Sequence, residues 1–468
     1  MTSKHNNEKR ITFRINMKLF YLFTLIVTWI FYPASNISTA IKYTSIDSKH
    51  KLLWKTKIGN TSFRTNIFLN DTVLIIGSNG ENYMDYQFSD QGSGVYFINP
   101  KNGQIRINAA ESDWGDFDVN GVLVYNNLLY YGNDNEEFIC SDLNGRILWR
   151  KVASGDIEHK PVLLNIRGKN LIVYASELGE VRAIEPKTGK KIWSYFAPSF
   201  SGWKDGDNTS LFKVKAFLSN TKSFFTAPIL VDLNDDKISD LVYLGYDNII
   251  YAINGETGNL FWTYEEKNGY ITNIAKQSGR DGKNQVQVIV HNYSDLNSLT
   301  KQESFTISLS GAKMSASSEY YTELPISSLN DLEIGVNSFF ISSVDSLYYF
   351  EDNKIKQKIY TGETYIFKNW ENNLDTTSRN SANQLFADKL IKYGSHEKCA
   401  VILNQFDYGD EERIAFLIIV NVETEEVVVK LSLESSSEMP PVIVDVNKDG
   451  KNEILVSCSN GYLYCYQL

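Results

Sequence analysis

Short runs of alternating apolar and polar residues recur along the chain, separated by turns rich in Gly, Asp and Asn. The pattern is clearest in two stretches, Pro228–Asn254 and Pro441–Gln467, which align with each other without a gap. Each stretch is an apolar run, an acidic loop and two more apolar runs joined by Asp247-Asn248 or Asn460-Gly461. Asn and Gly readily take the positive φ that tight hairpin turns require. Both stretches are therefore predicted to form three antiparallel strands.

A fourth strand follows the first stretch but not the second. Leu260–Glu266 comes after a Thr-Gly turn and carries Trp262, whereas the second stretch ends at Leu468. Near the other end of the chain, Leu52–Gly59 has the same outer-strand pattern around Trp54. We expect this segment to supply the missing strand, so that the N-terminal and C-terminal strands close a ring.

Turn glycines that precede an apolar strand mark a longer repeat. They are Gly103, Gly145, Gly189 and Gly258. The first two intervals are about 40–45 residues, which is the length of one four-stranded propeller blade. The last interval is longer, which predicts an inserted loop at 198–222.

The middle of the chain is expected to hold three more blades, at 270–317, 324–362 and 365–433. Within the last of these, the spacing of Leu385, Phe386, Leu390 and Ile391 predicts a helix in Thr376–Gly394, as part of an insertion near 370–394. The chain contains 13% aromatic residues, with 28 Tyr and 25 Phe, which favours strands. The predicted fold is all-β, a single propeller over 52–468 with eight four-stranded blades, or seven as the alternative count.

The repeat resembles that of the PQQ-like β-propellers, A-x-D-x-x-T-G-x-x-x-W. One copy is formed by Ala183, Glu185, Thr188, Gly189 and Trp193, and another by Ala252, Asn254, Thr257, Gly258 and Trp262. Because Trp recurs at one position of the repeat, in Trp54, Trp149, Trp193 and Trp262, we expect it to pack between neighbouring blades. The resemblance also implies membership of the quinoprotein alcohol dehydrogenase-like superfamily, and so leaves a quinone-dependent enzyme as an alternative function.

The two acidic loops carry oxygen-bearing side chains at positions 1, 3, 5 and 9. In the first loop these are Asp232, Asn234, Asp236 and Asp240, and in the second Asp445, Asn447, Asp449 and Glu453. With the carbonyl of position 7, Ile238 or Lys451, they could form the hard-oxygen shell that Ca²⁺ prefers. The loops also resemble FG-GAP repeats, the Ca²⁺-binding propeller repeats of integrin α-subunits.

A turn stabilised by Asp and Asn without any ion is the alternative for both loops. Gly450 eases the sharp bend at position 6 of the second loop, whereas the first has Lys237 there, which predicts a weaker first site. The matching loop of the third blade has Asn165 but no further acids, and is predicted to be metal-free. We therefore expect any Ca²⁺ to brace the structure and not to take part in catalysis.

The N-terminus combines basic residues with the apolar run 19–32 and a small-residue segment that ends at Ala40. This run is short for a membrane span of about 20 residues, so residues 1–40 are predicted to be a cleaved signal peptide, with an uncleaved anchor as the alternative. Translation from Met17 would give a more compact signal. Residues 41–51 would be a linker, and the chain would enter the secretory pathway to become extracellular or periplasmic.

Charge and cysteine content limit the choice of partners. The formal net charge of −10 disfavours nucleic acid, because an acidic surface repels phosphate. The four cysteines, Cys140, Cys399, Cys458 and Cys465, have no metal-ligand spacing, and buried free thiols or one or two disulfides both fit them. No adjacent cysteine pair exists for the vicinal disulfide that is usual in quinoprotein dehydrogenases. PQQ is therefore not an expected cofactor.

No catalytic constellation is recognisable among the His, Ser, Asp and Glu residues. The sequence thus predicts a secreted or membrane-tethered, non-catalytic propeller that binds a protein or glycan partner and has Ca²⁺-braced loops. Trp114, Trp203 and Trp370 lie outside the repeat and are candidates for a binding rim. The alternatives are a quinoprotein dehydrogenase and a bacterial envelope-assembly scaffold, although the latter's lipobox cysteine is absent after the signal.

Overall fold

A computed structural model provides the structure of the chain. It describes residues 51–80, 92–108, 117–197, 224, 227–245, 247–266, 269–278, 284–292, 300–307, 311, 318–322, 332–335, 338–342, 346–351, 354–360, 367–368, 374–375, 382–387, 390–407, 413–424 and 426–467. The chain divides into two compact units, of which the smaller comprises Met1–Thr44 and Ile366–Thr377. Its described residues form an antiparallel ribbon of β26 (Phe367–Lys368) and β27 (Leu374–Asp375). The larger unit comprises Ser45–Tyr365 and Ser378–Leu468.

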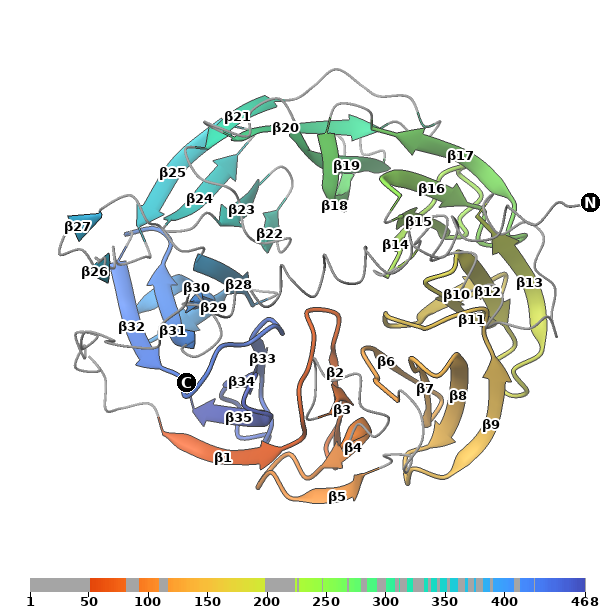
Figure 1. Cartoon of the computed structure of the whole chain (residues 1–468), viewed down its shortest axis with the longest axis horizontal. Helices are drawn as coiled ribbons and strands as arrows, with labels where there is room; N and C mark the ends of the chain where they lie inside the picture. Colours follow the sequence, from red (N-terminus) through yellow and green to blue (C-terminus); the bar gives the residue numbers. More distant parts are fainter. Residues whose placement is uncertain are drawn as a thin grey trace, which may run out of the picture. The chain divides into compact units, whose positions relative to one another are not determined.

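The larger unit consists of antiparallel sheets whose strands follow chain order from blade to blade, as labelled in Figure 1. Blade 1 contains β2 (Ile67–Leu69), β3 (Leu74–Asn79), β4 (Ser93–Ile98) and β5 (Ile105–Asn108). Blade 2 contains β6 (Val122–Tyr125), β7 (Leu128–Gly132), β8 (Glu137–Asp142) and β9 (Ile147–Val152). Blade 3 contains β10 (Val162–Ile166), β11 (Lys169–Ala175), β12 (Glu180–Ile184) and β13 (Lys191–Phe196). Blade 4 contains β14 (Ile229–Val231), β15 (Asp240–Leu244), β16 (Ile249–Ile253) and β17 (Leu260–Glu265).

Four further sheets complete the larger unit. Blade 5 contains β18 (Gly269–Ser278), β19 (Asn284–Asn292), β20 (Thr300–Ile307) and β21 (Ser318–Thr322). Blade 6 contains β22 (Leu332–Gly335), β23 (Ser338–Ser342), β24 (Ser346–Glu351) and β25 (Lys354–Tyr360). Blade 7 contains β28 (Ala382–Phe386), β29 (Ile391–Tyr393), β30 (His396–Asp407), β31 (Arg413–Asn421) and β32 (Glu426–Ser432). Blade 8 contains β33 (Val442–Val444), β34 (Glu453–Cys458), β35 (Tyr462–Gln467) and β1 (Leu52–Lys57). The prediction of an all-β propeller is confirmed.

Neighbouring blades pack face to face through the strands in the middle of each sheet. Phe138 of blade 2 stacks on Tyr174 of blade 3 with ring centroids 4.1 Å apart, and Tyr243 of blade 4 belongs to one core cluster with Val181 of blade 3. Middle strands such as β12 and β34 are buried on both faces because each face meets another blade. The outer strand β9 instead alternates between half-buried and exposed residues. This difference explains the apolar runs in the middle strands and the polar alternation of the outer ones.

The repeated tryptophans dock on the next blade, as the sequence predicts. The indole Nε1 of Trp54 donates to the Pro100 carbonyl at 2.9 Å, and Trp193 donates likewise to Gly255 at 3.2 Å. Each ring lies against the turn glycine of the next blade. At Gly258, which has a φ of 75°, an added Cβ would lie 2.5 Å from the Trp193 ring. The glycine is thus needed both for its left-handed backbone and for the close approach of the ring.

The two ends of the described chain meet in one sheet, which confirms the predicted closure. β1 pairs antiparallel with β35, with Trp54 opposite Cys465. The Ile58 N–H donates to the Gly461 carbonyl at 2.9 Å, and the Gln467 N–H donates to the Lys51 carbonyl at 3.0 Å. Because Trp54 docks on blade 1 while its strand belongs to blade 8, this one segment joins the first and last blades.

The helix predicted for Thr376–Gly394 is wrong where the structure describes this segment. Residues Ala382–Phe386 and Ile391–Tyr393 are strands, and both pair antiparallel with β30. Ala387 and Ile391 belong to the core cluster between blades 7 and 8. The helical spacing of apolar residues was overridden because β30 offers a long strand edge that a local pattern does not reveal.

Several predicted features lie outside the described residues, namely the signal or anchor at 1–40, most of the linker at 41–51 and the insertion at 198–222. The same holds for Trp114, Trp203 and Trp370. Among the residues that the structure describes, no helix is both long enough and apolar enough to cross a membrane. All four cysteines are buried free thiols. Burial raises the pKa of the Cys458 thiol to about 12 and that of Cys140 to about 11.

Candidate functional site

The two acidic loops occupy equivalent places in blades 4 and 8, between the first and second strands. Position 1 follows the first strand directly, and position 9 is the first residue of the second strand, Asp240 of β15 or Glu453 of β34. Both loops use a left-handed backbone at positions 4 and 6. In blade 4 these are Asp235 and Lys237, with φ of 62° and 68°. The glycine at position 6 of blade 8 takes a φ of 85° without the side-chain strain that Lys237 bears.

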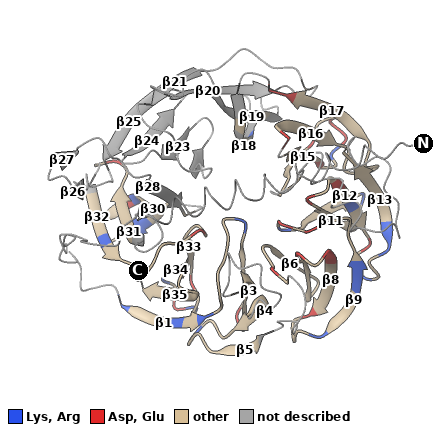
Figure 2. Cartoon of the chain, in the orientation of Figure 1, with Lys and Arg blue, Asp and Glu red and all other residues tan. Residues whose placement is uncertain are grey.

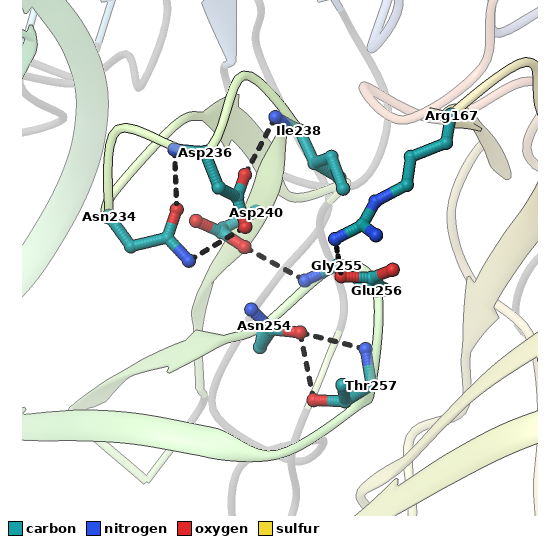
Figure 3. A network of polar contacts seen from close by, with 9 residues as sticks. All are labelled: Arg167, Asn234, Asp236, Ile238, Asp240, Asn254, Gly255, Glu256 and Thr257. Carbon is teal, nitrogen blue, oxygen red and sulfur yellow. Dashed lines mark hydrogen bonds and ion pairs between the residues drawn. The ribbon is translucent and has the colours of Figure 1, made fainter.

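Positions 1, 3 and 5 come together in the blade 4 loop, and their oxygens accept backbone N–H groups of the loop. The Asp232 carboxylate accepts the Lys237 N–H at 2.9 Å. The Asn234 Oδ1 accepts the Asp236 N–H at 3.1 Å, while the Asn234 amide donates to Asp236 Oδ2 at 2.8 Å. The Asp236 Oδ1 accepts the Ile238 N–H at 2.7 Å. These contacts hold the loop in a tight curl, as Figure 3 shows for Asn234, Asp236 and Ile238.

The blade 8 loop repeats this arrangement. Asp445 accepts the N–H groups of Lys448 at 2.6 Å and Gly450 at 2.9 Å. Asn447 accepts the Asp449 N–H at 2.8 Å, and Asp449 accepts the Lys451 N–H at 2.8 Å. The two loops share the N–H contacts of positions 1, 3 and 5, which indicates that the motif itself sets them. They differ in the amide of position 3, because Asn447 donates to Glu453 at 3.1 Å, whereas Asn234 donates to Asp236.

The acid at position 9 is placed differently from the other three. Asp240 and Glu453 are fully buried. Asp240 accepts the N–H groups of Leu233 and Gly255, both at 2.9 Å, and so ties the loop to the turn between β16 and β17 (Figure 3). Glu453 accepts the Val446 N–H at 2.9 Å. Burial raises the pKa of both carboxyls, and the other acids of each loop add to the rise.

The residues therefore fit a Ca²⁺ ion in part. Carboxylate and amide oxygens at positions 1, 3 and 5 surround each curl, and these are the donors that Ca²⁺ prefers. Of the position 7 residues, Ile238 is buried and Lys451 is exposed. Among the described residues, no three His, Cys, Asp or Glu side chains are grouped closely enough to hold a metal ion. An ion in either loop would thus need the Asn oxygen and a backbone carbonyl as well as carboxylates.

Ion pairs connect a neighbouring blade to the blade 8 loop and to the turn beside the blade 4 loop. Lys448 forms an exposed ion pair of 2.8 Å with Asp71 of blade 1, and this contact lowers the pKa of Asp71. In blade 3 the equivalent loop is a two-residue turn at Arg167 and Gly168, with Asn165 Oδ1 accepting the Gly168 N–H at 3.2 Å. The guanidinium of Arg167 reaches Glu256 of blade 4 at 3.1 Å, beside the acidic loop (Figure 3).

A largely buried polar cluster at the other ends of the strands was not predicted from the sequence. Arg64, just before blade 1, forms a 2.8 Å ion pair with Glu158, just before blade 3. The Asn120 amide, just before blade 2, donates to Glu158 at 2.8 Å. Burial lowers the pKa of the adjacent His159 to about 4, and the charge of Arg64 contributes. These residues have no common motif, so only the order of the blades brings them together.

Comparison with known proteins supports the repeat assignment. Residues 93–277 match the model of the family described as outer membrane protein assembly factor BamB. This match runs from β4 of blade 1 to β18 of blade 5, so the likeness to this family is carried by that part of the propeller. No curated protein matches the chain. The FG-GAP resemblance of the acidic loops stays a prediction.

Solved structures share the fold at low sequence identity. The Dos1 propeller has a TM-score of 0.54 and 10% identity, covering 89% of this chain and 95% of that one. Quinohemoprotein alcohol dehydrogenase ADHIIG from Pseudomonas putida HK5 has a TM-score of 0.50 and 13% identity, covering 91% and 78%. BamB from Moraxella catarrhalis has a TM-score of 0.48 and 14% identity, covering 90% and 98%. At such identities the likeness concerns the fold alone.

Proposed function

We propose that this chain is a non-catalytic propeller scaffold, exported from the cytoplasm, that binds a protein or glycan partner. The strongest support for the proposal comes from the hydrogen bonds of the acidic loop side chains. Asp232, Asp236, Asp445 and Asp449 each accept backbone N–H groups of their own loop, so their charge fixes the shape of the surface. A preformed surface loses little conformational entropy when it binds a partner.

The match to the BamB family adds a second argument. By its name, BamB is an assembly factor for outer membrane proteins, and the match spans four blade junctions of this chain. A scaffold needs blades that hold their relative positions, and tryptophan contacts between blades 8 and 1, 2 and 3, and 3 and 4 provide such rigidity. Residues 1–40 would direct export, either as a cleaved signal peptide or as an anchor.

We further propose that each acidic loop binds one structural Ca²⁺. The ligands in blade 4 would be Asp232, Asn234, Asp236, the Ile238 carbonyl and, after a shift of its side chain, Asp240. In blade 8 they would be Asp445, Asn447, Asp449, the Lys451 carbonyl and Glu453. When bound, the ion neutralises the clustered carboxylates and holds the curl closed. The side chains keep the backbone in place, and Gly450 makes the second loop the easier one to close.

The test of the scaffold proposal is in-cell photo-crosslinking in the native host. A photoreactive amino acid is placed singly at exposed positions of the outer strands and of the turns between the first and second strands of a blade, such as Asp71 and Arg167. Crosslinked species are identified by mass spectrometry. One recurring partner, crosslinked from a contiguous set of positions with and without Ca²⁺, supports a scaffold. A spectrum of unrelated proteins from all positions alike contradicts it.

A quinoprotein dehydrogenase is the second candidate, favoured by the shared fold of the ADHIIG enzyme. Such an enzyme would reduce an artificial electron acceptor when given quinone, Ca²⁺ and an alcohol or sugar. Turnover under these conditions would refute the non-catalytic proposal.

A further inference from the structure

The outer strands of four consecutive blades have an unusual charge. β1, β5, β9 and β13, with sequences LLWKTK, IRIN, ILWRKV and KIWSYF, contain Lys and Arg but no Asp or Glu. The whole chain, in contrast, has a net charge of −10. The next outer strand, β17, contains Glu265 and no basic residue. Figure 2 shows the basic residues on β1, β9 and β13.

On β9 the basic residues alternate with exposed apolar ones. Leu148 and Val152 are 43% and 63% exposed, and Arg150 lies between them on the same face of the strand. Single exposed apolar side chains are normal, but exposed apolar side chains that are grouped are typical of an interaction surface. Leu148, Arg150 and Val152 thus present apolar, basic and apolar side chains on one face of β9. The complementary extended segment has apolar, acidic and apolar side chains on alternate residues, which all lie on its one matching face.

The backbone of β9 also has an open edge. In the order of its sheet β9 is the last strand, paired only with β8 among the described strands. At its far end the Val152 carbonyl accepts Arg182 of blade 3 at 2.9 Å, so the open stretch is Ile147–Lys151. A strand edge presents N–H and C=O groups that an added strand can pair with.

The turn between β12 and β13 of blade 3 lies against the opposite face of β9, which carries Trp149 and Lys151. Trp149 donates to the Lys187 carbonyl at 3.1 Å, and the stem of Lys151 lies over Gly189. Lys187 and Lys190 of that turn are exposed, as is half of Ile192 just beyond it. We define the β9 edge surface as Leu148, Arg150, Lys151, Lys187, Lys190 and Ile192.

Two basic side chains of blade 2 already form ion pairs within their own blade. Arg150 forms a 3.2 Å ion pair with Glu137, and Arg146 forms one of 3.3 Å with Asp142. Both guanidinium groups remain partly exposed, by 36% and 76%. Such exposed pairs contribute little stability, so an acidic ligand can compete for the cations.

We propose that the β9 edge surface binds an extended acidic segment of the partner protein as an additional β-strand. This inference rests on the proposed scaffold function and names the surface and the chemistry of the partner. An added strand uses the backbone edge, the apolar alternation and the positive charge together. An anionic lipid surface would use only the charge and the apolar side chains, so the strand accounts for more of what β9 presents.

The probe is a fluorescein-labelled peptide, Thr-Val-Glu-Glu-Val-Val-Glu-Thr, whose second, fourth and sixth residues place Val, Glu and Val on one face of a strand. It is titrated with the full chain and followed by fluorescence anisotropy. We expect saturable binding that weakens as the salt concentration rises. Replacing the central Val by Pro removes a backbone N–H and should weaken binding at least tenfold. A peptide with Lys in place of Glu should not bind.

Two variants test the surface. Leu148→Glu and Arg150→Glu should each weaken peptide binding at least tenfold. Phe261→Glu is the matched control, because Phe261 precedes Trp262 in β17 as Leu148 precedes Trp149, is 40% exposed and lies in the outer strand without basic residues. This control should leave binding unchanged. Far-UV circular dichroism and Tm confirm that every variant is folded.

Several outcomes would overturn the inference. These are no binding at millimolar peptide, equal binding of the Pro peptide, or equal loss in the Phe261→Glu control. The intact chain could instead sediment with vesicles of 20% phosphatidylserine and fail to bind the peptide. If Leu148→Glu then abolished the sedimentation, the surface would be assigned to lipid. If crosslinking identifies one partner on another surface and the peptide does not bind, the inference of an added strand is refuted, whereas the proposed scaffold function is supported.

Discussion

Closure of the propeller by β1 can be tested with Trp54→Ala. The indole is 7% exposed, lies against Gly103 and donates to the Pro100 carbonyl at 2.9 Å. Truncating a buried Trp to Ala costs about 3–5 kcal/mol, because the apolar surface is lost and a cavity remains. For a cooperative unit of this size we expect a fall in Tm of roughly 5 °C.

The matched control is Leu52→Ala on the same strand. Leu52 is 38% exposed, so its truncation should cost less than about 1 kcal/mol. Differential scanning calorimetry of the two variants separates loss of the Trp54 contact from a general effect of changing β1.

Deleting residues 52–59 should have a larger effect than Trp54→Ala. The deletion removes all pairing with β35 and exposes the edge of that strand to other chains. A synthetic peptide of residues 50–60, added to the truncated chain, should restore Tm and suppress aggregation, because it refills the same position. A truncated chain that melts within a degree or two of the intact one, with no response to the peptide, would refute closure by β1.

Three further predictions concern Ca²⁺, redox chemistry and pH. If the loops bind Ca²⁺, Asp449→Ala should remove more of the Ca²⁺-dependent rise in Tm than Asp236→Ala, because Gly450 allows the sharp bend of the second loop. A Tm that changes with neither Ca²⁺ nor chelator would show that both loops are hairpin turns that bind no ion. Given PQQ, Ca²⁺ and alcohols or sugars, the purified chain should not reduce a redox dye. His159 has a folded pKa of about 4 against an ordinary 6.5, so the unfolded chain takes up its proton first as the pH falls. Urea unfolding should therefore show about 2 kcal/mol of stability lost through this group between pH 7.5 and pH 5, and His159→Gln should lack that part; equal pH dependence in both proteins would contradict the reasoning.

The repeat itself could be predicted from the sequence. Turn glycines, docking tryptophans and the two aligned stretches recur because each blade buries the same positions against its neighbours, so local patterns carry this information. The division of the first four blades, the pairing of Leu52–Lys57 with the last strand and the docking of Trp193 all agree with it. The predicted left-handed bend at Gly450 is a local property of the same kind.

Contacts between distant segments were decided by the tertiary structure. Residues Ala382–Phe386 have helical spacing, yet they form a strand because β30 supplies a partner edge. The spacing of the acidic loops could not show that Asp240 and Glu453 turn inward, since their acceptor role depends on buried N–H groups. The Arg64–Glu158 ion pair joins blades 1 and 3, and basic residues collect on outer strands of successive blades. The charged and apolar residues of one strand could therefore be assigned to a core, an ion pair or an exposed edge only after the fold had determined their neighbours.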